Sequence, residues 1–320
     1  MTNQAVLLMA YGSPDRLDQV EAYYTDIRRG NPPTPALLEE LLLRYRAIGG
    51  GSPLSRIVET QRVAVETELA RRGRPLPVYA GMRHIEPRIA EIVGRMADDG
   101  VEEAVAIALA PQASMSITAY RRAVEGATAG LGERAPSFTF VSSWCEEPDF
   151  VAGLAATTGE ALARFPDRAA VHLMFSAHSL PERVVAAGDT YPDELARTAA
   201  LVGERLGRTD YTFSYQSAGR TEEAWLGPDI LAEIRRLGSE GVTELVVSPV
   251  GFIAEHLEVL YDIDIEAQGV ARPLGIRLER PRMLNDDPHL VAAVANVAMR
   301  ALPVPIATGA DAPVAAATRP

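Results

Sequence analysis

Short apolar runs alternate with longer amphipathic segments along most of this chain. Short apolar runs are typical of strands buried on both faces, and apolar positions three or four apart are typical of helices. Their alternation predicts parallel sheets covered by helices. The strands are expected at residues 5–10, 78–82, 104–109, 138–142, 171–177, 211–215 and 245–250. The clearest helices are expected at residues 53–72, 87–96, 149–164 and 288–302.

A short internal repeat favours two similar α/β halves. Residues 89–92 read IAEI and lead to a strand after Gly100, while residues 231–234 read LAEI and lead to a strand after Gly241. Both copies have the order helix, glycine, buried strand. We therefore expect two related halves joined near residues 143–148.

Composition and charge narrow the class of protein. The 320 residues are 47% hydrophobic and 23% charged, as in a globular protein with a large core. No run approaches the roughly 18 to 20 apolar residues of a membrane helix, and the apolar start lacks the basic residues of a signal peptide. We expect a soluble, cytoplasmic protein. The net charge of −12 argues against nucleic acid as a partner, and the nearly uncharged residues 304–320 predict a disordered tail.

Two observations limit the cofactors that the chain can bind. Cys145 is the single cysteine, so an internal disulfide is excluded, and one thiol cannot by itself hold a zinc ion or an iron–sulfur cluster. The glycine-rich motifs of dinucleotide and phosphate loops are absent, because Gly49, Gly50 and Gly51 lack the following lysine. A nucleotide cofactor is not supported.

The first candidate for chemistry is His178, which follows an expected strand. Open α/β sheets bind ligands beyond the carboxyl ends of their strands. His178 stands at such an end and is followed by a turn-forming stretch, residues 179–182. It is either a structural side chain or an imidazole exposed at the edge of the sheet.

The second candidate is an acidic segment with carboxylates spaced four apart, at Glu258, Asp262 and Glu266. On a helix this spacing stacks them along one side, which is either a solvated face or a place for a cation. His256 lies about 200° from Glu258 on a regular helix. Both can face one cleft only if the helix starts late or is distorted.

Together these residues predict a metal-transfer site with a resident base. One imidazole and a few carboxylates suit a divalent ion that is handed on, whereas a closed set of Cys and His ligands would retain it. The same groups can accept protons near neutral pH.

Four blocks of sequence occur in an order typical of one enzyme family. They are FSAHSLPE with GDTYP (175–192), YQSAGRT with WLGP (215–228), PVGF with HLEVLYD (249–262), and RYRAIGGGSP (44–53). Over residues 6–302 the chain resembles the ferrochelatases, which insert Fe²⁺ into a porphyrin. The motif MAYG at residues 9–12 resembles the soluble bacterial members that metallate coproporphyrin III.

The resemblance implies a chelatase-like fold of two Rossmann-like domains, residues 1–145 and 146–303, with a porphyrin cleft between them. The final helix can pack on the first domain. His178 and Glu258 would be the catalytic residues and would face the iron, with Asp262 and Glu266 forming a path for protons or metal and His256 behind them. The resemblance also implies six porphyrin contacts, at Tyr11, Arg28, Arg44, Tyr45, Ser52 and Tyr120.

Iron is then a substrate, and no resident cofactor is expected. Some relatives hold a [2Fe-2S] cluster with one internal and three C-terminal cysteines; Cys145 matches the internal one, but none follows Leu302. Glu255 stands where relatives often have Asp, which puts its role in question. We expect a monomer with transient partner enzymes of haem biosynthesis.

Three alternatives remain open from the sequence. The substrate could be protoporphyrin IX or another metal and tetrapyrrole, and a two-domain cleft also suits a non-catalytic carrier of porphyrin or haem. The division of roles between His178 and Glu258 is open too, because each can bind metal and accept a proton.

Overall fold

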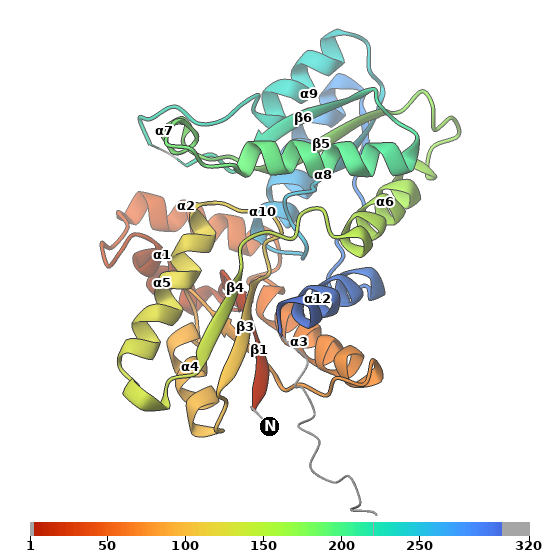
Figure 1. The fold of residues 1–320 in the computed structure, drawn as a ribbon. Helices are drawn as coiled ribbons and strands as arrows, with labels where there is room; N and C mark the ends of the chain where they lie inside the picture. The colour runs from red at the N-terminus through yellow and green to blue at the C-terminus, as the bar shows by residue number, and fades with distance from the viewer. Residues whose placement is uncertain (1–2, 220, 303–320) are drawn as a thin grey trace, which may run out of the picture.

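The computed structural model describes residues 3–219 and 221–302 and contains two parallel sheets, each with four strands (Figure 1). In the first sheet the order is β2-β1-β3-β4, and in the second it is β6-β5-β7-β8. The strands are β1 (Gln4–Ala10), β2 (Val78–Met82), β3 (Glu103–Ala108), β4 (Ser137–Val141), β5 (His172–His178), β6 (Tyr211–Gln216), β7 (Glu244–Ser248) and β8 (Arg277–Glu279). The predicted α/β fold of two similar parallel sheets is confirmed. The predicted tail at 304–320 lies outside the described residues.

Helices cover both faces of each sheet. Their bounds are α1 (Val20–Ile27), α2 (Pro35–Ala47), α3 (Leu54–Arg71), α4 (Ile89–Asp98), α5 (Met115–Ala129), α6 (Pro148–Leu162), α7 (Glu182–Ala186), α8 (Tyr191–Leu206), α9 (Ile230–Ser239), α10 (Leu257–Leu260), α11 (Gln268–Ala271) and α12 (Pro288–Ala301). A π-helix, η3 (Asp262–Ala267), follows α10, and short 3₁₀ turns are η1 (Leu17–Gln19), η2 (Gly132–Arg134) and η4 (Arg272–Leu274). Among the described residues no helix is long and apolar enough to span a membrane.

The two sheets are built to the same plan. β1 and β5 hold the same place, the second, in the strand order of their sheets. The repeat seen in the sequence falls on equivalent units, α4–β3 and α9–β7. Strand register makes the match exact to the residue: Val6 pairs with the first residue of β2, and Leu173 pairs with the first residue of β6. Tyr11 and His178 each lie five residues beyond these positions. Tyr11 is therefore the counterpart of His178 in the first sheet.

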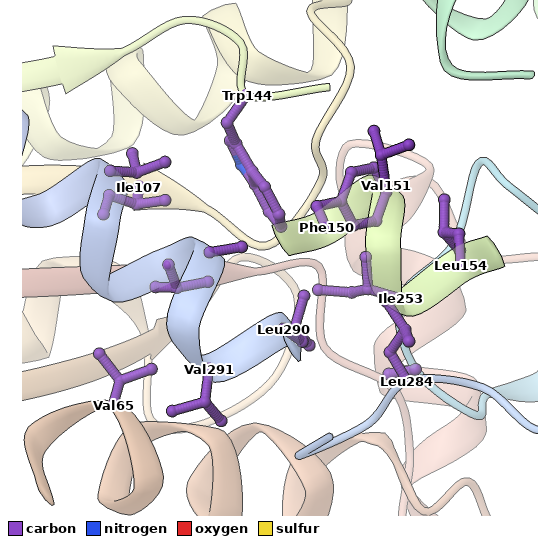
Figure 2. Packing of buried hydrophobic residues seen from close by; sticks show 14 of the residues in the cluster. Val65, Ile107, Trp144, Phe150, Val151, Leu154, Ile253, Leu284, Leu290 and Val291 are labelled. Atoms are coloured by element: carbon purple, nitrogen blue, oxygen red, sulfur yellow. The ribbon is translucent and has the colours of Figure 1, made fainter. Parts of the chain in front are cut away.

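One continuous core joins the two halves. Helix α12 packs against α3 of the first half and against α6, which leads into the second half (Figure 1). Figure 2 shows Leu290 and Val291 of α12 among side chains of both halves, with Trp144 against Phe150 at a ring distance of 5.1 Å. The boundary at residue 145 stays a prediction.

Polar contacts add to this junction at the ends of the strands. The side-chain amide of Gln112, just after β3, donates to Thr198 Oγ1 (3.2 Å) and to the carbonyl of Val250 (3.3 Å). The backbone N–H of Ala113 and the hydroxyl of Ser143 both donate to Glu194 Oε2 at 2.6 Å. These hydrogen bonds fix the carboxyl-end edge of the first sheet relative to the second half.

Candidate functional site

His178 is the last residue of β5, and its hydrogen bonding defines which ring nitrogen is available. Nδ1–H donates to the carbonyl of Ser179. In the neutral ring Nε2 therefore carries the free lone pair, and it lies 3.6 Å from Glu258 Oε1. The loop after β7 crosses closely here, because a side chain at Gly251 would place its Cβ 2.6 Å from Cβ of Ala177. His178 thus presents one basic, metal-binding nitrogen to Glu258.

His256 approaches the same carboxylate from the other side. Helix α10 begins only at Leu257, and the backbone of His256 is extended, with φ −158° and ψ −179°. Because His256 precedes the helix, its side chain can lie on the same side as that of Glu258. His256 Nδ1–H donates to the carbonyl of Ala254 (2.9 Å), so Nε2, 3.4 Å from Glu258 Oε2, is the nitrogen that gains a proton. Burial lowers the pKa of His256, but Glu258 outweighs burial and the net pKa is raised.

Glu258 remains ionised because basic side chains surround it. Burial is the largest influence and by itself raises the pKa of Glu258, but the two histidines and Arg44 together lower it to about 2. Its carbonyl accepts a 2.7 Å hydrogen bond from the side-chain amide of Gln216, at the end of β6. The carboxylate is therefore a fixed negative charge at neutral pH.

Asp262 and Glu266 continue from Glu258 along the wide turn of the π-helix, a rare element that is frequent at functional sites. Asp262 is buried, and one of its oxygens accepts a hydrogen bond from Ser217. Burial, and then the charge of Glu258, raise the pKa of Asp262 to about 6. A carboxyl group with that pKa can both take up and release protons near neutral pH.

Arg44 of α2 lies against these carboxylates from the first half. Its guanidinium is 3.5 Å from Asp262 Oδ1 and 3.8 Å from Glu266 Oε1, and it stacks over the ring of Tyr261 at 4.9 Å. The side chain predicted to contact the porphyrin is thus paired with the protein's own carboxylates.

A cluster of rings from the first half faces Glu258. The ring of Tyr11 lies 4.4 Å from that of His84 and 6.5 Å from that of Tyr23. Burial is the main cause that raises the pKa of Tyr11 to about 12, and the charge of Glu258 is the second. His84 Nδ1 lies 2.6 Å from the carboxylate of Asp26. The buried Nε2 of the same ring has no hydrogen-bond partner among the described residues.

Tyr23, Asp26 and His84 were not predicted as site residues from the sequence. His84 could have been found, because it comes just after β2 and the carboxyl ends of strands were the positions to search. Its register counterpart in the second sheet is Ser217, which binds Asp262. The same edge therefore supplies a site residue in both halves.

The six predicted porphyrin contacts differ in accessibility. Tyr11 is 36% exposed, Arg28 is exposed over the ring of Tyr24, and Arg44 is partly exposed. Tyr45, Ser52 and Tyr120 are buried, and the hydroxyl of Tyr45 is 2.8 Å from that of Ser13. Contact between a ligand and these three side chains requires an opening of the structure; their role stays a prediction.

An open cavity of about 470 Å³ lies between the two halves. It is lined by the start of α5 and by the segment from α7 to α8, and its lining includes Met115, Arg183 and Asp189. Within the described ranges no group of three or more His, Cys, Asp or Glu is arranged to hold a metal ion.

Glu255, whose role was in question, forms ion pairs with Arg280 at 3.0 Å, as Asp264 does at 2.6 Å.

Known proteins share the fold and the sequence pattern of this chain. SirB from Bacillus subtilis is a sirohydrochlorin chelatase whose structure was solved with Fe³⁺. It superposes on this chain with a TM-score of 0.59 at 13% sequence identity, covering 94% of this chain and 95% of SirB. The fold is therefore that of the chelatases. A family model described as Ferrochelatase matches residues 3–302. The chain belongs to the ferrochelatase family, the enzymes that insert iron into porphyrins.

Two curated relatives cover nearly the whole chain. The ferrochelatase of Deinococcus radiodurans is 42% identical over 308 residues, which is 94% of this chain and 97% of that protein. The coproporphyrin III ferrochelatase of Geobacillus kaustophilus is 43% identical over 301 residues, or 92% of this chain and 95% of that protein.

Proposed function

We propose that this enzyme inserts Fe²⁺ into coproporphyrin III and releases two protons, giving Fe-coproporphyrin for haem biosynthesis. The observation that carries the proposal is the pair formed by His178 Nε2 and Glu258 Oε1, 3.6 Å apart and facing the ring cluster of the first half. The name of the Geobacillus kaustophilus relative supports coproporphyrin as the substrate.

Insertion requires the two pyrrole N–H protons to leave while iron sheds its waters. A flat macrocycle holds its lone pairs in the ring plane, so a cleft that fits a bent ring better than a flat one lowers the barrier, by about 1 to 5 kcal/mol. His178 Nε2 is the nitrogen free to accept a pyrrole proton or bind iron. Glu258 then supplies a second ligand or passes the proton to Asp262 and Glu266.

Iron is a substrate in this proposal, and no cofactor resides in the protein. Cys145 is buried, and burial raises the pKa of its thiol to about 11, so it remains protonated at neutral pH. A protonated, buried thiol is a poor cluster ligand.

The test is anaerobic incubation of the protein with Fe²⁺ and either coproporphyrin III or protoporphyrin IX, following the absorption change on metallation. We expect a higher kcat/KM with coproporphyrin III. Faster metallation of protoporphyrin IX would overturn the substrate assignment, and binding spectra without metallation would identify a carrier.

His178→Ala tests the site itself. We expect metallation to be lost while coproporphyrin binding remains measurable, because the ring is held mainly by other residues. Fluorescence titration measures the binding, and turnover at the wild-type rate would remove His178 from the mechanism.

A further inference from the structure

Asn285, in the loop between β8 and α12, holds the chain just ahead of His256. Its backbone is left-handed, with φ 50°, a conformation that asparagine tolerates better than most residues. Its backbone N–H donates to the carbonyl of Ile253 at 2.8 Å, and its side-chain Oδ1 accepts from the backbone N–H of Glu255 at 2.9 Å. One residue therefore binds the chain on both sides of Ala254.

The side-chain contact fixes the orientation of one peptide unit. The carbonyl of Ala254 and the N–H of Glu255 belong to the same planar trans peptide, so they point in opposite directions. Asn285 accepts from the N–H, and the carbonyl on the other side accepts from Nδ1–H of His256 at 2.9 Å. The carbonyl cannot turn away from His256 unless the bond to Asn285 breaks.

The orientation of this peptide reaches the carboxylate of Glu258. Nε2 of His256 lies 3.4 Å from Oε2 of Glu258, which leaves Oε1 to face Nε2 of His178 at 3.6 Å. A rotation of the His256 ring would remove the contact on the Oε2 side and free the carboxylate to turn. The direction of Oε1 thus depends on the carbonyl of Ala254.

Asn285 is itself anchored in the interior of the molecule. Its carbonyl accepts a 2.6 Å hydrogen bond from the side-chain amide of Gln61, a buried residue of α3 in the first half. Leu284, the residue before it, is buried in the core shared by the two halves, as is Ile253 (Figure 2). The loop that holds the peptide is therefore fixed to both halves.

We propose that Asn285 is a positioning residue for iron insertion. By holding one peptide unit it orients the ring of His256, and that ring keeps Oε1 of Glu258 directed at His178. Asn285 acts only through these residues and is not itself a catalytic residue. The inference deepens the proposed function, because its kinetic test uses coproporphyrin III, while its spectroscopic test needs no substrate.

Asn285→Gly removes the acceptor and keeps the backbone. Glycine tolerates positive φ, so the bond to the carbonyl of Ile253 can persist while the N–H of Glu255 loses its partner. We expect kcat for metallation of coproporphyrin III to fall about tenfold or more, because a catalytic group is misplaced. The KM for coproporphyrin III should stay within about twofold, since porphyrin binding does not depend on this peptide.

Two further variants make the kinetic result specific. Asn285→Asp restores an acceptor at a residue type that also tolerates the left-handed backbone, and kcat should return to within about threefold of wild type. Asp167→Gly is the matched control, because Asp167 makes the same kind of bond, at 3.0 Å to the backbone N–H of Ala169, before the amino end of β5. It should leave kcat and KM unchanged.

Proton NMR of the full-length protein at one fixed pH, without substrate, reports on the ring directly. Because Nδ1–H of His256 is held by a carbonyl, we expect a slowly exchanging downfield imidazole proton in wild type. His256→Gln assigns this resonance by its loss. The resonance should disappear in Asn285→Gly and persist in Asn285→Asp and Asp167→Gly, which a general loss of stability would not produce.

An unchanged kcat in Asn285→Gly, or a loss that Asn285→Asp does not restore, would overturn the proposal. If the glycine variant does not fold, the folded wild-type protein still decides, because absence of the His256 proton there would mean that the carbonyl does not hold the ring. Failure of the wild-type enzyme to metallate coproporphyrin III would overturn the proposed substrate, and the NMR comparison would still test Asn285.

Discussion

At the scale of single residues, the site is defined by one carboxylate between two imidazoles. Both histidines donate Nδ1–H to a backbone carbonyl, and both direct Nε2 toward Glu258. Backbone acceptors thereby fix the tautomers. The sequence could identify His178 and Glu258 as candidates, but it could not show these carbonyl contacts, which depend on how the loops turn.

Glu258→Gln should lower the pKa of His256, because burial then acts without the opposing carboxylate. NMR titration of the imidazole measures this shift. Metallation should fall by about a hundredfold or more, the usual contribution of a general base. An unchanged His256 pKa would show that the two side chains do not interact in solution.

Asp262→Asn should stabilise the protein at high pH. The pKa of Asp262 is raised from 3.8 to about 6, so the folded state holds the proton more tightly than the unfolded chain. Stability from this group is fully present below pH 3.8 and is lost as pH rises through 6. The asparagine avoids that loss, which is worth about 3 kcal/mol.

Urea unfolding of the Asp262 variant and wild type at pH 5 and pH 8 measures the difference. The gain should be larger at pH 8. A gain that is the same at both pH values would contradict the raised pKa, since it would not depend on ionisation of Asp262.

At the scale of elements, the buried parallel strands were predictable and the π-helix η3 was not. Each of the seven expected strands corresponds to an observed one. The signal is clearest in β1 and β3, which are covered on both faces and are nearly continuous apolar runs. β8 was missed, since its three residues are Arg, Leu and Glu and form no apolar run. The π-helix was not predicted either, because the sequence of the acidic segment indicated only that a helix here must start late or be distorted for His256 and Glu258 to face one cleft.

Arg280 holds both ends of that segment. Its guanidinium binds Glu255, just before His256, and Asp264 within the π-helix, with four contacts between 2.6 and 3.0 Å. Arg280→Met would leave two carboxylates uncompensated in a mostly buried place. We expect a loss of about 2 to 3 kcal/mol, less than for a fully buried pair because Asp264 is partly exposed.

Chemical denaturation measures the effect of Arg280→Met. Arg282→Met is the matched control, because Arg282 also binds two carboxylates, Glu160 and Asp287, but is half exposed. The control should lose less than about 1 kcal/mol. Equal losses in the two variants would show that Arg280 has no special role in holding the segment.

At the scale of the whole molecule, a shared core makes the two halves one folding unit. Leu290 of α12 is 1% exposed and belongs to the cluster that reaches both sheets. The final helix was expected to be able to reach the first half, and the structure places it against α3 and α6. The sequence showed the periodicity of this helix but not its neighbours, which are distant along the chain.

Leu290→Ala should therefore destabilise both halves together, by about 2 to 5 kcal/mol. Trp144 contacts the first sheet, donating to the carbonyl of Ala108, and Trp225 belongs to the second half. Each can be followed by fluorescence after the other is replaced by Phe. Coincident unfolding curves are expected, whereas two separate midpoints would mean that the halves unfold independently.

The residue-level match between the two sheets has a consequence for the chemistry. Tyr11 and His178 hold the same position in two copies of one structural plan, and both face Glu258. The two positions now differ in chemistry. Tyr11 offers an aromatic surface with a hydroxyl that stays protonated, and His178 offers a base. A flat substrate bound between these two residues would have an aromatic ring against one face and a base against the other, so its two faces would be in chemically different surroundings.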